Sequence, residues 1–164
     1  MQPGRFSGNM TTSLTKIICA VDFSSAADSI VRYAAAIYSR DVELTLLYVA
    51  PAENNHDDLL RKNLHEFSRY SDMLSQRNAD SVFTVAYGDP AAEILVYAKE
   101  HNADMILLGS HGTTAIGRLL VGSTAETVMR QASCPVVILK MPNSNGNAVH
   151  DQLQNDTFHD NNKQ

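Results

Sequence analysis

Three glycines and a serine form the part of this sequence best suited to binding chemistry. Their spacing is Gly109-x2-Gly112-x9-Gly122-Ser123. An apolar run over 104–108 comes directly before them and a helical pattern begins at the last two, so a glycine-rich loop connects a strand to a helix N-terminus. Such an N-terminus attracts anions, because it presents unpaired backbone N–H groups and about half a unit of positive charge. Glycine also lets a bulky phosphate approach the backbone. The pattern therefore predicts a nucleotide-phosphate site.

Strand-like and helical segments alternate along the chain, and they indicate how this loop is positioned. Continuous apolar runs are typical of strands buried on both faces, and apolar residues three and four positions apart are typical of helices. We expect strands over 16–21, 43–49, 81–86, 104–108 and 135–139, and helices over 25–39, 57–78, 90–102 and 123–132. This order predicts an α/β fold, a single-domain, doubly wound, five-stranded parallel sheet with helices on both faces.

Ligands of doubly wound sheets bind beyond the carboxyl ends of the strands, where the strand order reverses. Two segments should meet there: Val21-Asp22-Phe23-Ser24, which follows the first strand, and the loop 109–122. Two roles stay open for Asp22, which could cap the next helix or bind ribose or a phosphate-bound Mg²⁺. Ser123 begins a Ser-x-x-Glu capping box with Glu126, so we expect Ser123 to cap its helix as well as to contact phosphate.

The composition is that of one globular domain without a nucleic-acid or membrane role. The chain has 164 residues, 44% of them hydrophobic, and a formal net charge of -5 at pH 7. General nucleic-acid binders are usually basic, and no apolar run is long enough to cross a membrane. Because the N-terminus also lacks the apolar region of a signal peptide, we expect a cytoplasmic protein. Polar composition at both ends predicts a flexible leader over 1–14 and a disordered tail over 142–164, around a folded domain over 15–141.

The glycine pattern and its flanks resemble the universal stress protein family, in the subgroup that binds ATP. The spacing Gly-x2-Gly-x9-Gly-(Ser/Thr) is kept without a gap, and the resemblance covers about residues 16–140. The matching flanks are Val21-Asp22-x-Ser24, Gly88-Asp89-Pro90, Arg118-Leu119-Leu120 and Cys134-Pro135-Val136. The resemblance implies a fold similar to that of the adenine nucleotide alpha hydrolases. It also implies an adenine-nucleotide site, with ATP, or else ADP or AMP, as the ligand and Mg²⁺ beside it.

The resemblance further implies which residues lie at the nucleotide. They are Asp22, Ser24, Val49, Gly109, His111, Gly112, Arg118, Gly122, Ser123 and Thr124. In this family the glycine loop lies near ribose and phosphates, the helix start binds phosphates, and the backbone at Val49 meets the adenine. Asp22 is also the candidate ligand of nucleotide-bound Mg²⁺, and we favour Arg118 closing over the phosphates rather than staying a solvated charge. The family often has histidine where this chain has Tyr48, a difference that bears on base selectivity.

Groups for efficient catalysis are missing from the same pattern. Val121 and Thr124 flank Gly122-Ser123, where a Walker A motif would place lysine, and neither Gly-x-Ser-x-Gly nor His-x-Gly-His occurs. Such a site suits holding ATP more than transferring its phosphate. We therefore predict a regulatory nucleotide-binding protein of the stress response, a sensor or effector with an unidentified protein partner and no catalytic residues. Two alternatives stay open: a slow ATPase or phosphotransferase assisted by Asp22 or His111, and a nucleotide-independent interaction protein.

The last predicted strand should lie at an edge of the sheet. An exposed apolar edge is prone to pair with another chain unless it is covered. In the family that the chain resembles, this strand pairs with its copy across a two-fold axis. The resemblance thus implies a homodimer through Pro135, Val136, Val137, Ile138 and Leu139.

Overall fold

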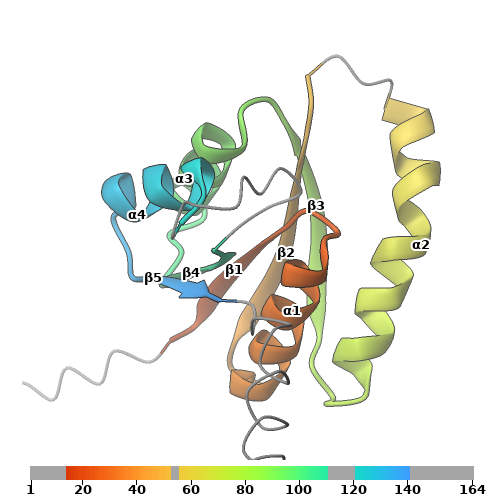
Figure 1. The fold of residues 1–164 in the computed structure, drawn as a ribbon. Helices are drawn as coiled ribbons and strands as arrows, with labels where there is room; N and C mark the ends of the chain where they lie inside the picture. Colours follow the sequence, from red (N-terminus) through yellow and green to blue (C-terminus); the bar gives the residue numbers. More distant parts are fainter. Residues whose placement is uncertain (1–13, 53–55, 111–120, 141–164) are drawn as a thin grey trace, which may run out of the picture.

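The computed structural model describes residues 14–52, 56–110 and 121–140, with only the backbone of 56–60 and 62 (Figure 1). The predicted leader and tail lie almost wholly outside this part of the chain, so the predicted domain boundaries stay predictions. Within it, the bounds of the elements lie close to the predicted ones. The strands are β1 Lys16–Val21, β2 Glu43–Ala50, β3 Ser81–Tyr87, β4 Met105–Gly109 and β5 Val136–Leu139. The helices are α1 Ser25–Ile37, α2 His56–Ser75, α3 Pro90–Glu100 and α4 Ser123–Gln131.

The five strands form one sheet in the order β3-β2-β1-β4-β5, and every neighbouring pair is parallel. Each connection between consecutive strands contains one helix, as parallel pairing requires. The predicted fold class, a doubly wound α/β sheet, is therefore confirmed. The order also confirms that β5 is an edge strand, with β3 at the opposite edge.

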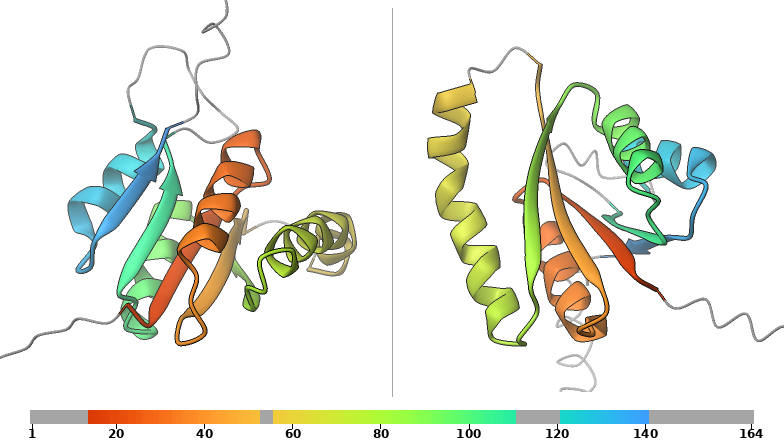
Figure 2. Two further views of the ribbon diagram at one scale, coloured as in Figure 1. Left: turned by 90° about the horizontal axis from the view of Figure 1, so that it is seen from below. Right: turned by 180° about the vertical axis from the view of Figure 1, so that it is seen from behind.

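The helices cover the two faces of the sheet in pairs, α1 and α2 on one face and α3 and α4 on the other (Figure 2). The side chains of β1 show why its apolar run does not alternate with polar residues. Ile17, Cys19 and Val21 pack towards α1 and α2, whereas Ile18 packs towards α3 and α4. Both faces of the central strand are thus buried, as in other parallel sheets.

The amino end of β1 is fastened to the start of β4 by one carboxylate. Asp104 Oδ2 accepts hydrogen bonds from the Thr15 hydroxyl at 2.7 Å and from the Thr15 and Lys16 backbone N–H groups at 2.9 Å. These bonds lower the pKa of Asp104, with the Thr15 hydroxyl contributing most. A carboxyl group whose pKa is lower in the folded chain stabilises the fold above its unfolded pKa and loses that effect as the pH falls.

We expect Asp104→Asn to weaken the dependence of stability on pH below about pH 4, where an unfolded aspartate takes up its proton. The asparagine cannot titrate, so the free energy of unfolding of the variant should fall less steeply with decreasing pH than that of the wild type. Urea unfolding at several pH values measures the two slopes, with the exposed Asp80→Asn as the control. Equal slopes in wild type and Asp104→Asn would contradict the assignment.

One tyrosine of α2 packs into the core with a hydroxyl that finds no partner in the described part of the chain. Tyr70 is 0% exposed, and its Oη has no hydrogen-bond partner among the described residues. A buried polar group without a partner costs roughly 1–3 kcal/mol. We expect Tyr70→Phe to raise the free energy of unfolding by about 1 kcal/mol, measured by urea denaturation. Tyr97→Phe is the control, because the Tyr97 hydroxyl lies 3.4 Å from Thr84 Oγ1; a loss of stability in Tyr70→Phe would mean that its hydroxyl is satisfied.

Candidate functional site

The strand order reverses between β1 and β4, which lie side by side in the middle of the sheet. Ile17, Ile18 and Cys19 of β1 pair with Met105, Ile106 and Leu107 of β4. Because the two strands are parallel, their carboxyl ends lie at the same edge of the sheet. The segment that begins at Asp22 and the loop that begins after Gly109 therefore start next to each other, as the sequence predicts.

The two ends of the glycine-rich loop are joined by a hydrogen bond. The Gly122 N–H donates to the Ser110 carbonyl at 2.6 Å, and the Ser110 N–H donates to the Leu139 carbonyl of β5 at 2.9 Å. Ser110 is 3% exposed, so this junction is buried. The start of α4 is thereby held against the carboxyl end of β4. His111, Gly112 and Arg118 lie outside the described residues, and their predicted contacts stay predictions.

The cap of α4 differs from the sequence prediction. Gly122 is the N-cap, with φ -71° and ψ 160°, and it makes no side-chain cap bond. Ser123 is the first helical residue and the predicted capping box with Glu126 does not form; the Glu126 N–H bonds the Gly122 carbonyl at 2.9 Å, and its carboxylate pairs with Arg130 at 3.0 Å. The expectation that Ser123 caps the helix is therefore wrong. A glycine cap has no side-chain acceptor for the first N–H groups, which leaves that role to another acceptor, such as an anion.

The loop after β1 is ordered by its own polar side chains. Asp22 Oδ1 accepts hydrogen bonds from the Ser24 N–H at 3.1 Å and from the Ser24 hydroxyl at 2.5 Å. Ser24 in turn caps α1, because its Oγ accepts from the Ala27 N–H at 3.4 Å. Of the two roles left open for Asp22, the cap thus belongs to Ser24. Asp22 holds the capping residue in place and is half-buried at the edge where β1 and β4 end.

The end of β2 borders the same edge. Val21 of β1 pairs with Tyr48 of β2, so Val49 lies just beyond the end of β1 and next to the Asp22 loop. Val49 packs on the α3 and α4 face, whereas Tyr48 packs on the α1 and α2 face. Burial raises the pKa of the Tyr48 phenol, the Asn63 side chain lowers it, and the Asp22 carboxylate raises it further. The Tyr48 ring therefore lies behind the site, against the helices, within electrostatic range of Asp22.

Sequence reasoning missed one residue of this edge, Phe23. Its φ is 60°, in the left-handed region that a bulky residue rarely adopts. Its ring contacts the rings of Tyr48, Phe67 and Tyr70. The only signal in the sequence is an aromatic residue placed between two polar ones at a strand end, which by itself does not reveal these contacts.

Neither a membrane span nor a metal cluster is found in the part of the chain that the structure describes. None of its helices is long and apolar enough to cross a bilayer. The same residues contain no group of three or more His, Cys, Asp or Glu that could hold a metal ion.

Comparison with known proteins places these features in a family. The model of the universal stress protein family matches residues 13–140. The universal stress protein MJ0531 of Methanocaldococcus jannaschii is 30% identical over 140 residues, which are 77% of this chain and 82% of the relative. The solved structure of MJ0577 from the same organism superposes with a TM-score of 0.73 at 25% identity, over 80% of this chain and 99% of that one.

Two more distant structures share the fold and were solved with adenine nucleotides. The Archaeoglobus fulgidus universal stress protein in complex with dAMP has a TM-score of 0.62 at 22% identity, over 76% of this chain and 96% of that one. An Arabidopsis thaliana universal stress protein family member with AMP bound has a TM-score of 0.60 at 17% identity, over 82% and 97%. At these identities the likeness shows the fold.

Proposed function

Because the chain belongs to the universal stress protein family, we propose that it binds an adenine nucleotide at the carboxyl edge of the sheet and acts as a regulatory binding protein. The observation that carries the proposal is the bond between the Gly122 N–H and the Ser110 carbonyl. It holds a glycine-capped helix N-terminus against the end of β4, beside the end of β1. An N-terminus in this place supplies N–H donors and a favourable dipole to a phosphate.

Each end of the nucleotide has its own group of residues in this proposal. Phosphates lie at the start of α4, on Gly122, Ser123 and Thr124, and along the loop that begins at Gly109. The ribose lies near Asp22 and the adenine near the backbone of Val49. The other contacts carried over from the family are those of Ser24, His111, Gly112 and Arg118. One mononucleotide accounts for all of these groups of residues.

Mg²⁺ enters the proposal only together with the nucleotide. Its preferred ligands are oxygens, and in nucleotide sites it usually keeps several waters and is bound by one or two carboxylates together with the phosphates. The half-buried Asp22 carboxylate at the edge of the sheet suits this role. Phosphate oxygens of the nucleotide would be further ligands of the Mg²⁺ ion, and the ion would neutralise part of the phosphate charge.

The direct test is to denature freshly purified protein and to identify the released nucleotide by chromatography and mass spectrometry. Stoichiometric ATP, ADP or AMP supports the proposal, and ADP or AMP in place of ATP calls for a turnover assay on Asp22→Ala. If no nucleotide is released, titration calorimetry with ATP decides. Failure to bind any adenine nucleotide at millimolar concentration would overturn the proposal.

We also propose that the protein is a homodimer that pairs through β5. All four residues of β5 are apolar and half-buried, although the strand lies at the edge of the sheet. An apolar edge strand without a neighbour is prone to pair with another chain. Pairing of two copies of Val136–Leu139 across a two-fold axis would cover both edges at once.

A further inference from the structure

Phe23 holds a backbone conformation that its own residue type disfavours. It lies between Asp22 and Ser24 in the loop from β1 to α1, with φ 60°. For a residue with a Cβ, the left-handed region costs roughly 1–2 kcal/mol, and such a conformation persists only where the surrounding structure imposes it. The contacts of the Phe23 side chain supply this constraint.

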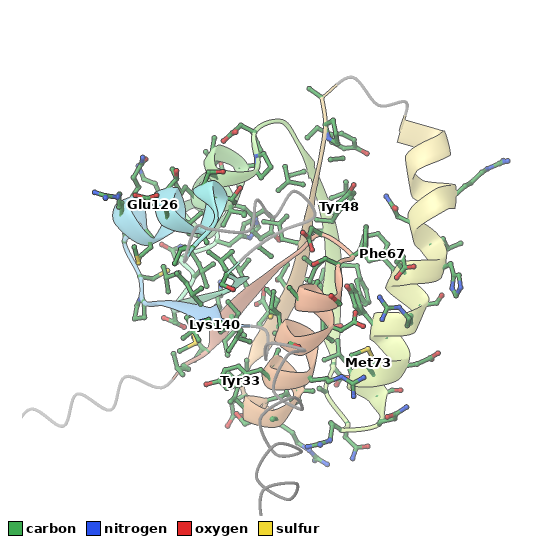
Figure 3. All side chains as sticks on the ribbon, viewed as in Figure 1. Tyr33, Tyr48, Phe67, Met73, Glu126 and Lys140 are labelled. Atoms are coloured by element: carbon green, nitrogen blue, oxygen red, sulfur yellow. The ribbon has the colours of Figure 1, made fainter. Side chains whose placement is uncertain are left out.

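The ring of Phe23 lies between the sheet and α2. Its centroid is 4.6 Å from that of Tyr48 in β2, 5.3 Å from that of Phe67 and 5.9 Å from that of Tyr70, both in α2. Phe67 approaches Phe23 edge-on and lies between α2 and the sheet (Figure 3). Aromatic pairs at these separations are favourable beyond the area that they bury. Contacts from two other elements thus hold the middle residue of the loop.

An ion pair ties the same helix to the segment that follows the loop. Arg69 of α2 contacts the carboxylate of Asp28, in the first turn of α1, at 2.8 Å. The Asp28 N–H bonds the Ser24 carbonyl at 3.3 Å. The aromatic contacts and the ion pair therefore both connect α2 to residues 22–28, the segment that carries two of the residues assigned to the nucleotide.

We propose that Phe23 is the positioning residue of this site: through its ring, the packing of α2 against the sheet sets the placement of Asp22 and Ser24. The proposal rests on the proposed nucleotide-binding function. Phe23 does not itself contact the nucleotide. It fixes the backbone so that Asp22 bonds Ser24 and Ser24 caps α1, and a shift of α2 would change the affinity of the site.

Three variants test the role of the ring by calorimetric titration with ATP. Phe23→Leu keeps bulk but loses the aromatic contacts, and Phe23→Gly removes the backbone strain together with the ring. The control is Phe83→Leu, because Phe83 of β3 belongs to the same cluster, 5.1 Å from Phe67, but lies outside the loop. We expect both Phe23 variants to bind ATP about tenfold more weakly and the control to bind nearly as the wild type does. Wild-type affinity in Phe23→Gly, or equal losses in all three, would overturn the proposal.

A double-mutant cycle tests whether Phe23 acts through Asp22. If it does, Asp22→Asn should weaken ATP binding strongly in the wild type and only slightly in Phe23→Leu, because the loop is already misplaced. Additive losses would mean that the two residues act independently and would refute a positioning role.

A readout without ligand separates this proposal from the function on which it rests. In Phe23→Leu, the N–H groups of Ser24 and Ala27 should exchange faster with solvent, because their hydrogen bonds to Asp22 and Ser24 would loosen. In Phe83→Leu, the exchange of these two amides should be unchanged. Absence of ATP binding in the wild type, with this exchange pattern intact, would reject the nucleotide site and keep the positioning of the loop. Unchanged exchange in Phe23→Leu would reject the positioning.

Discussion

Replacing Ser123 with aspartate should strongly weaken nucleotide binding while leaving the fold at least as stable as before. Ser123 is exposed and is the first residue of α4, so the new side chain displaces no core residue. A carboxylate in the first turn interacts favourably with the helix dipole, by about 0.3–1 kcal/mol. The same charge would lie where the proposed site places the phosphates. The variant therefore separates folding from binding, because the two effects have opposite signs.

The expected loss of affinity in Ser123→Asp is large. Two like charges about 4 Å apart repel by roughly 4 kcal/mol at an effective dielectric constant near 20, and each 1.4 kcal/mol changes a dissociation constant about tenfold. With screening by salt and Mg²⁺, we expect the dissociation constant for ATP to rise by at least about 100-fold. Calorimetric titration measures the affinity, and thermal unfolding measures the stability.

The matched control for Ser123→Asp is Ala92→Asp. Ala92 is exposed and lies in the first turn of α3, a helix that does not start at the junction of β1 and β4. This variant receives the same charge in the first turn of another helix, so its ATP affinity should stay near that of the wild type. If Ser123→Asp bound ATP as tightly as this control, the phosphates would lie elsewhere and the start of α4 would not be their site.

Replacing Ile138 with proline should convert the proposed dimer into monomers. Ile106 and Ser110 donate their N–H groups to the carbonyls of Pro135 and Leu139, which places those two residues of the β5 segment towards β4. Because successive residues of a strand point their backbone groups in opposite directions, the Ile138 N–H points away from β4, to the open edge. Proline at this position removes an edge donor and keeps the pairing with β4.

The effect of Ile138→Pro on the dimer is doubled by symmetry. Each copy loses a donor and gains a ring at the interface, so we expect the dimer dissociation constant to rise by at least about tenfold, given about 1 kcal/mol for each of the lost hydrogen bonds. Light scattering at micromolar concentration measures the change. A monomeric wild type would refute the dimer, and a dimeric Ile138→Pro would move the interface to another surface.

Val85→Pro is the control at the opposite edge. The Gly88 N–H bonds the Ala50 carbonyl of β2 at 2.9 Å, and the register of β3 with β2 has no interruption. The N–H of Val85, three positions earlier, therefore points away from β2. This substitution places the same ring on the free edge of β3, and the protein should stay dimeric.

Local patterns were sufficient to predict the elements and the fold class. The continuous apolar run of β1 indicated burial on both faces, and the alternation of strands and helices indicated parallel pairing. These properties depend on neighbours within a few residues and on the periods of the two regular structures. The predicted start of the helix at residue 90 is also confirmed, since Asp89 caps α3 through a 2.9 Å bond from the Ala92 N–H.

The same local signals gave the wrong cap for α4. A serine followed three residues later by glutamate is a common helix start, and it favoured Ser123. In the folded chain the Gly122 N–H is taken by the carbonyl of Ser110, at the end of another element. That bond places the helix start one residue earlier than the motif suggests. The pairing of Gly122 with Ser110 depends on packing of α4 against the sheet, which a local motif does not contain.

The sequence by itself determined the α/β class, the position of the glycine motif and the family to which the chain belongs, because each of these lies in the order and spacing of nearby residues. Only the tertiary structure decided the left-handed conformation of Phe23 and its contact with α2. Phe23 and Phe67 are far apart along the chain and meet at 5.3 Å. Such a contact exists only once the sheet has aligned β1 with β2 and α2 has packed over them, and the energy that it supplies then holds the loop in a conformation that no local preference favours.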